Sequence, residues 1–174
     1  MAEPTGHGLE PRAWQGIVYR PCQAGAVEVR RLFNFAGAWP PVPSPGEFGW
    51  EAAVEGRLVG GVVVERHGAE GFVDGPVVVD PPRGVEALDV AAQFFGPLLD
   101  QASQLGMKAL YGRPQGLDRL WVRFGFVPLP EASLPGALRN RPGTGLYAWR
   151  RPGTYAVATP ESTAERQERR RGRR

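Results

Sequence analysis

Hydrophobic and polar positions follow two different periods along the first part of the chain. Residues 16–22 (GIVYRPC) are rich in β-branched and aromatic side chains, which is typical of a strand. Residues 26–39 carry apolar side chains three and four positions apart and indicate a helix. Residues 40–49 hold four prolines in their first six positions and predict a loop. Residues 50–66 predict a hairpin that turns at Glu55-Gly56, with an almost wholly apolar second arm typical of a central strand.

The middle of the chain predicts an interrupted strand and then a long helix. Residues 72–80 have strand composition, but Pro76 cannot donate to a ladder, so a bulge or splay is expected at Gly75-Pro76. Residues 85–105 have a helical apolar stripe, made of Leu88, Ala91, Ala92, Phe95, Leu98, Leu99 and Ala102. A proline inside a helix costs about 3 kcal/mol, so we expect a break at Gly96-Pro97 and a second helical piece opening at Pro97.

Short elements complete the pattern. They are a strand at 107–113, a helix at 116–124 that ends at Gly125, a strand from 126, a linker at 131–143 and a final strand at 144–151. The order β-α-β-β-β-α-β-α-β-β predicts an α/β fold with a mostly antiparallel beginning.

Length and composition are those of one globular domain with two extensions. At 174 residues the chain predicts a leader at 1–14, a domain at 15–151 and a tail at 152–174. No apolar run approaches the ~18 residues of a membrane helix, and the start lacks the features of a signal peptide. Cys22 is the single cysteine, so a reducing, cytoplasmic location is expected. Two separated histidines and one cysteine do not make a metal site.

The positive charge is concentrated at the end of the chain. Residues 161–174 carry six Arg and three Glu, which accounts for the whole net charge of +3, and residues 1–160 are formally neutral. Such a segment is either a solvated end or a polyanion contact, so nucleic acid is a candidate partner through 161–174.

Several segments in this order resemble the GNAT superfamily of acetyltransferases. They are IVYRPC, WEAAVEGRLVGGVVVER, VVVDPPRG, LDQASQLGMKALYG and LWVRFGF. The resemblance implies a GNAT-like mixed, mostly antiparallel central sheet that is flanked by helices and splayed between its fourth and fifth strands. It also implies acetyl-CoA as the cofactor, with its pyrophosphate on backbone N–H groups where the long helix begins.

The glycines that this anion site uses in the family are largely replaced. One register keeps Arg83 and Gly84, and the other brings Ala87, Asp89 and Ala91 to the glycine positions. Both registers bring a carboxylate to the anion site, which would repel a pyrophosphate and makes acetyl-CoA binding doubtful. Pro76 also removes one backbone donor of the strand that pairs with pantetheine in the family and that ends near Val79.

The catalytic positions implied by the resemblance also differ. Trp121 occupies the position of a tyrosine that can protonate the leaving thiolate, and an indole N–H is no useful acid. Pro114 stands where an asparagine is usual. Asp74 and Glu65, near the fourth strand, are candidates for the catalytic base; the alternative is that both are solvated ends of strands.

Three hypotheses follow. The replacement of the glycines, the asparagine and the tyrosine favours a catalytically degenerate GNAT-like protein. Such a protein would act as a binding or assembly component with protein partners, for instance in a phage virion. The alternative is an acetyl-CoA-dependent N-acetyltransferase acting on a primary amine. A third is an accessory factor that binds nucleic acid through its tail.

Overall fold

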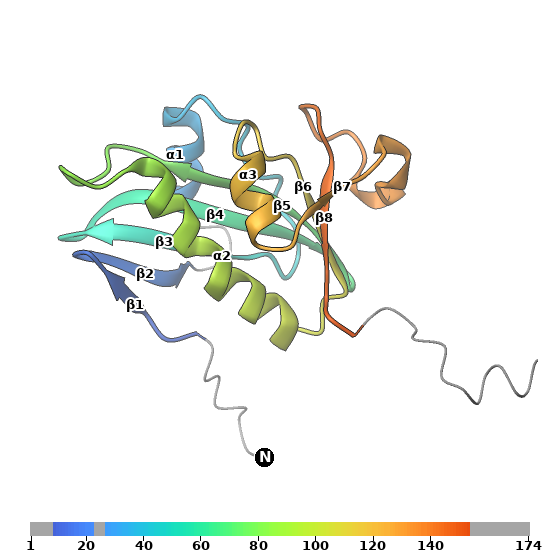
Figure 1. Ribbon diagram of the computed structural model, residues 1–174, viewed down its shortest axis with the longest axis horizontal. Helices are drawn as coiled ribbons and strands as arrows, with labels where there is room; N and C mark the ends of the chain where they lie inside the picture. Colours follow the sequence, from blue (N-terminus) through green and yellow to red (C-terminus); the bar gives the residue numbers. More distant parts are fainter. Residues whose placement is uncertain (1–8, 23–26, 154–174) are drawn as a thin grey trace, which may run out of the picture.

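The computed structural model describes residues 9–22 and 27–153 and contains one sheet of eight strands in the order β1-β2-β3-β4-β5-β6-β8-β7 (Figure 1). The strands are β1 (Arg12–Trp14), β2 (Ile17–Cys22), β3 (Phe48–Val54), β4 (Arg57–His67), β5 (Glu70–Val78), β6 (Ala109–Gly112), β7 (Val127–Pro128) and β8 (Tyr147–Arg150). All neighbours pair antiparallel except β5 and β6, which are parallel.

Helices cover both faces of the sheet. They are α1 (Val27–Phe35), α2 (Ala87–Gln104) and α3 (Asp118–Arg123), and two 3-10 turns, Glu131–Ser133 and Gly136–Leu138, lie in the predicted linker. Side chains alternate along β4: Val62 and Val64 pack in the core cluster that contains the buried face of α2, whereas Val63 packs with α1. Helices α2 and α3 therefore cover one face, in front in Figure 1, and α1 covers the other.

The predicted hairpin and strand irregularity are confirmed. Glu55 and Gly56 form the turn between β3 and β4, both with positive φ (48° and 79°). In the β4–β5 ladder Gly61 pairs with Val77 and Val63 pairs with Asp74, so β5 has one extra residue at Gly75-Pro76, a cis peptide. This is a β-bulge, and Gly75 takes a φ of 91° that other residues rarely adopt.

Two expectations are wrong. Residues 12–14, expected within a loose leader, form β1, because they pair with β2 at Arg12–Tyr19 through Trp14–Ile17. The expected break at Pro97 is absent and α2 is one helix. Pro97 and Leu98 are buried against the sheet, and this packing offsets the cost of the proline. The helix buries Val90 and Phe94 and leaves the predicted core residue Leu88 54% exposed.

The fold class is confirmed: a mixed, mostly antiparallel sheet lies between helices, and it opens between β5 and β6, the fourth and fifth strands of the predicted order. Among the described residues no helix is long and apolar enough to cross a bilayer.

Candidate functional site

The site begins where β5 and β6 separate. Their last paired residues are Val73 and Gly112, but β5 continues to Val78. The N–H of Val79 donates to the Val59 carbonyl (2.7 Å) on the β4 side, so it is not available to a ligand in the gap. Because amide directions alternate along a strand, the N–H and C=O of Val78 face the gap left by β6. The gap thus offers one backbone donor and one acceptor at Val78.

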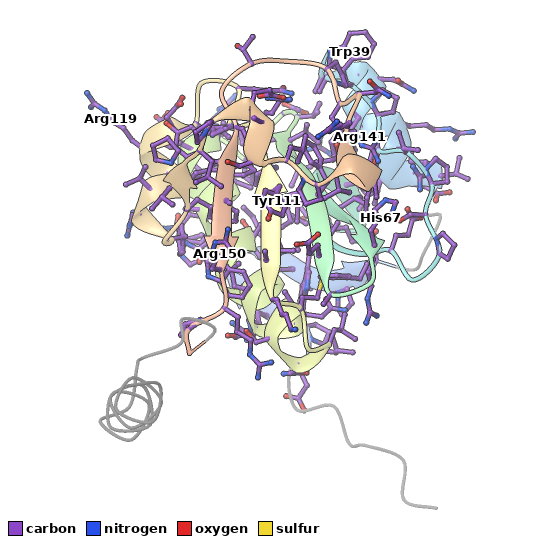
Figure 2. The ribbon with its side chains drawn as sticks, turned by 90° about the vertical axis from the view of Figure 1, so that its right-hand side faces the viewer. Trp39, His67, Tyr111, Arg119, Arg141 and Arg150 are labelled. Atoms are coloured by element: carbon purple, nitrogen blue, oxygen red, sulfur yellow. The ribbon has the colours of Figure 1, made fainter. Side chains whose placement is uncertain are left out.

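A cavity of about 230 Å³ lies beside this gap on the α1 face of the sheet. Five chain segments line it: the end of α1 with the proline-rich loop, β4 at Glu65, β5 from Phe72 to Val77, the segment between β6 and α3, and residues 140–142 before β8. Trp39 and Arg141, from two of these segments, lie at the same end of the molecule in Figure 2.

A buried carboxylate forms the floor of this cavity. Glu65 on β4 is 0% exposed and accepts hydrogen bonds from the Val42 N–H (2.6 Å) and from Nε of Arg141 (2.6 Å). The guanidinium of Arg141 also lies over the ring of Phe72, 5.8 Å from its centroid. A buried charge of this kind is stable because its partner and its hydrogen bonds compensate desolvation.

Asp74 lies next to Glu65 on the same face of the sheet and also lines the cavity. Its Oδ2 is buried and has no hydrogen-bond donor among the described residues. Burial raises the pKa of Asp74 well above its usual value, and the negative charge of Glu65 raises it further. The two carboxyls therefore act on one another, since the negative charge of Glu65 disfavours a second negative charge on Asp74.

Trp121 lies on the opposite face of the sheet. It is fully buried, its Nε1 has no described partner, and its ring packs beneath Gly112, where an added Cβ would lie 2.3 Å from Cη2. The structure therefore brings Glu65 and Asp74 together and separates both from Trp121, which serves as packing at the point where the strands part.

The residues predicted to bind the cofactor surround the beginning of α2. Arg83 and Gly84 are exposed in the preceding turn, and Glu86 is the N-cap residue without a side-chain capping bond. The remaining three are Ala87, which begins the helix, Asp89, which is exposed in the first turn, and Ala91, which is buried in the core.

A second cavity, of about 440 Å³, lies between the first half of α2 and α3. Its charged lining consists of Asp89, Asp118, Arg119 and Arg123. Leu117, in the segment between β6 and α3, lines both this cavity and the one beside Asp74. Arg119 projects from α3 away from the body of the molecule in Figure 2.

Sequence reasoning missed Arg141 and Arg113. Arg141 reaches Glu65 from 76 residues away, and Arg113 is buried in a bidentate pair with Glu131. Neither arginine lies in a periodic element, so no local pattern marks it. Within residues 9–22 and 27–153 no group of His, Cys, Asp and Glu could hold a metal ion.

No protein-family model and no curated protein matches the sequence. Solved structures do match. An acetyltransferase of the GNAT family from Staphylococcus aureus aligns at TM-score 0.58 and 11% identity, over 76% of this chain and 98% of that one. An acetyltransferase from Streptococcus agalactiae aligns at 0.57 and 10%, over 79% and 100%.

N-acetylglutamate synthase from Neisseria gonorrhoeae, solved with coenzyme A and N-acetylglutamate, aligns at TM-score 0.57 and 14% identity, over 80% of this chain and 35% of that one. Identities this low establish the fold alone. The sheet that opens between β5 and β6, with α2 and α3 on one face and α1 on the other, is accordingly the GNAT acetyltransferase fold.

Proposed function

We propose that the protein is an acyl-CoA-dependent N-acyltransferase, with the acyl-CoA in the gap between β5 and β6 and the amine in the cavity beside Asp74. One observation carries this proposal: the β5–β6 ladder stops at Val73–Gly112, and the next residue of β5 is Asp74, a half-buried side chain with a buried Oδ2 that lines a cavity. The coenzyme A bound to the synthase of the same fold supports a thioester substrate.

Asp74 is the group that can handle the proton of the amine. An alkylamine is protonated near neutral pH and attacks a carbonyl only after it loses a proton. Asp74 takes this proton in its ionised form, and because burial raises its pKa, that form binds the proton more strongly than an ordinary aspartate does. The amine nitrogen would then bond to the acyl carbon and give up a second proton, the carbon–sulfur bond would break, and the leaving thiolate would take up one proton from solvent or from Asp74.

Glu65 has a different role in this proposal. It is held by Arg141 and by the Val42 amide, so its charge stays in place next to Asp74. That charge disfavours ionisation of Asp74 and keeps its proton affinity high. Glu65 is therefore a positioning residue, and Trp121, on the other face of the sheet, takes no part in proton transfer.

Because of the residues at the beginning of α2, we expect the diphosphate of acetyl-CoA to bind weakly. Glu86 and Asp89 place two carboxylates at the helix end where backbone N–H groups would meet an anion. Arg123 on α3 lines the same cavity as Asp89 and offsets part of this repulsion. We expect acetyl-CoA to bind with a Kd of about 100 μM or weaker, which corresponds to about 5.5 kcal/mol at most.

The test is calorimetry with acetyl-CoA on the full chain and on charge variants of α2. Asp89→Asn should bind acetyl-CoA about three- to tenfold more tightly, because it removes like charge near the diphosphate. Asp100→Asn is the matched control: it lies on the same helix, is exposed and pairs with Arg12, and its affinity should equal that of the wild type. No binding at millimolar acetyl-CoA, together with no release of coenzyme A in the presence of amines, would refute the proposal.

A second candidate function has its own supporting observation. The two carboxylates at the start of α2 and the packed Trp121 are the features of a GNAT-fold protein that has lost cofactor chemistry and serves as a binding or assembly component. It predicts the opposite calorimetric result: no heat from acetyl-CoA with the wild type or with Asp89→Asn.

A further inference from the structure

The charged groups around the Asp74 cavity are already paired within the protein. Arg141 is bound to Glu65, and Arg113 forms a bidentate pair with Glu131 that holds the pKa of Glu131 below its usual value. Nε of Arg113 has no partner but is buried under Gly143, where an added Cβ would lie 3.0 Å from Cδ and 3.9 Å from Nε. No cation in the lining therefore remains available to an anionic group of a ligand.

The rest of the lining is apolar or uncharged. Aromatic, proline and aliphatic side chains form most of the wall, among them Phe33, Trp39, Pro40, Val42, Pro76 and Pro142. Gln115 and Asn140 are its uncharged polar members. A volume of about 230 Å³ is small, with room for about eight groups the size of a water molecule. The one group in this lining that can accept a proton from a ligand is Asp74.

We propose that the acceptor is a primary amine at the end of a slender apolar stem that carries no anionic group near the amine. The inference rests on the proposed function and specifies its second substrate. The ammonium end meets Asp74, and the stem lies along the aromatic and proline walls toward Trp39, which is 64% exposed at the rim.

Other classes of amine fit this cavity less well. An α-amino acid places a carboxylate next to its amine, and that carboxylate would be desolvated between Glu65 and Asp74 without a free cation. An aminoglycoside is too large for the space. A polyamine would bring a second charge to an apolar wall. The favoured chemistry has two natural sources, a free alkylamine or the side chain of lysine.

The experiment measures coenzyme A release from acetyl-CoA by the full chain with matched acceptor pairs. Phenethylamine and phenylalanine share one stem and differ by the carboxylate, as do pentylamine and norleucine. We expect kcat/KM for each amine to exceed that of its amino acid by about 100-fold or more, the scale of rejection by a site that leaves a charge unpaired. The same measurement with Nα-acetyl-lysine amide and with a lysine peptide distinguishes the side chain of lysine from a free alkylamine as the natural acceptor.

Variants at exposed positions test the place of the stem. Trp39→Ala should lower kcat/KM for phenethylamine about fivefold through loss of the aromatic contact. Phe35→Ala is the matched control, because Phe35 is 80% exposed on the same segment and does not line the cavity. The kcat/KM of Phe35→Ala for phenethylamine should stay within about twofold of the wild-type value, since this variant loses no contact with the acceptor.

Binding of phenethylamine, measured by calorimetry without acetyl-CoA, keeps this inference testable even if no acyl transfer occurs. Binding that is weakened by both Trp39→Ala and Asp74→Asn supports it. Transfer to phenylalanine or norleucine at the same efficiency as to the amines would overturn the inference while leaving the acyltransferase function intact. Absence of acetyl-CoA binding would instead overturn the function, and absence of amine binding would overturn the inference.

Discussion

Asp74 is the residue whose environment departs most from that of a surface aspartate. Its pKa is raised by burial and, to a smaller extent, by the negative charge of Glu65. The remaining charged groups that act on it are Arg141, which is paired with Glu65, and Arg30, which is paired with Glu47. The protonated form of Asp74 is therefore favoured by folding.

The sign of the pH dependence follows from linkage. A carboxyl whose pKa is higher in the folded than in the unfolded chain stabilises the fold fully below about pH 4, its unfolded pKa, and loses this contribution as the pH rises through the folded pKa. Asp74→Asn keeps a donor to Glu65 and cannot ionise. We expect the free energy of unfolding of the wild type, measured by urea titration, to decrease relative to Asp74→Asn as the pH rises.

Asp100→Asn is the control for this measurement, because Asp100 is exposed and its ion pair with Arg12 is on the surface. A difference between the wild type and Asp74→Asn that is constant from pH 4 to pH 9 would show that Asp74 has an ordinary pKa. The same variant should also lose most acyl transfer, since an amide cannot accept the amine proton.

Arg141 compensates a charge that is otherwise buried. Its guanidinium is 13% exposed, and Glu65 is completely buried beneath it. Arg141→Met should lower the free energy of unfolding by about 3 kcal/mol at neutral pH, because it leaves a buried carboxylate without its partner. Arg139→Met is the neighbouring control, since Arg139 is exposed and contributes only its backbone carbonyl to Arg141. Equal stability of the two variants in urea would contradict the role of Arg141.

At the scale of elements, the separation of β5 from β6 depends on a contact between a strand and a helix. Gly112, the last paired residue of β6, has no room for a side chain: a Cβ would lie 2.3 Å from Trp121 Cη2 and 3.0 Å from the Val73 carbonyl. The indole ring on α3 thus lies against β6 at the point where the ladder ends. Trp121 stands at the position where the resemblance implies a functional tyrosine. In the structure it is a residue of the core.

Gly112→Ala should lower the free energy of unfolding by about 1–3 kcal/mol, because the added methyl group fits only if the indole ring of Trp121 moves. Trp121→Phe removes the atoms that would clash, so the double variant should lose less than the sum of the single changes. Gly136→Ala is the control, since a Cβ there meets nothing within 4 Å. Strict additivity in thermal or urea unfolding would show that the two residues do not conflict.

At the scale of the whole molecule, the net charge and the candidate site lie in different parts of the chain. Residues 1–160 are formally neutral, and the net charge comes from 161–174, which lie outside the described residues. The gap between β5 and β6 and both cavities are formed by residues of the body. Binding of a polyanion by residues 161–174 and binding of acyl-CoA by the body of the chain should therefore be independent of each other.

A chain lacking residues 161–174 should lose binding to a single-stranded oligonucleotide, because six arginines are removed. In the full chain this binding should weaken steeply between 50 and 200 mM salt, as phosphate contacts do. Acetyl-CoA at 1 mM, about ten times the expected Kd, should stabilise both chains by about 1.4 kcal/mol in thermal unfolding. Loss of the acetyl-CoA effect upon deletion would mean that the tail takes part in cofactor binding.

The order of elements could be predicted from the sequence because each element carries a local signal. The apolar second arm of the hairpin, the proline-rich loop and the helical stripe at 85–105 are such signals, and the resemblance rests on their order. Residues 12–14 and Pro97 were misjudged because pairing with β2 and burial against the sheet are tertiary contacts that outweigh local preference.

What the sequence by itself determined was therefore the fold class and two carboxyl candidates on consecutive strands, since strand period and residue type are local properties. Only the tertiary structure decided that Asp74 lies beside Glu65, which is paired with Arg141, and that Trp121 lies on the opposite face of the sheet. The physical reason is that proton affinity depends on burial and on neighbouring charge, and Arg141 is brought to Glu65 from 76 residues away by the path of the folded chain.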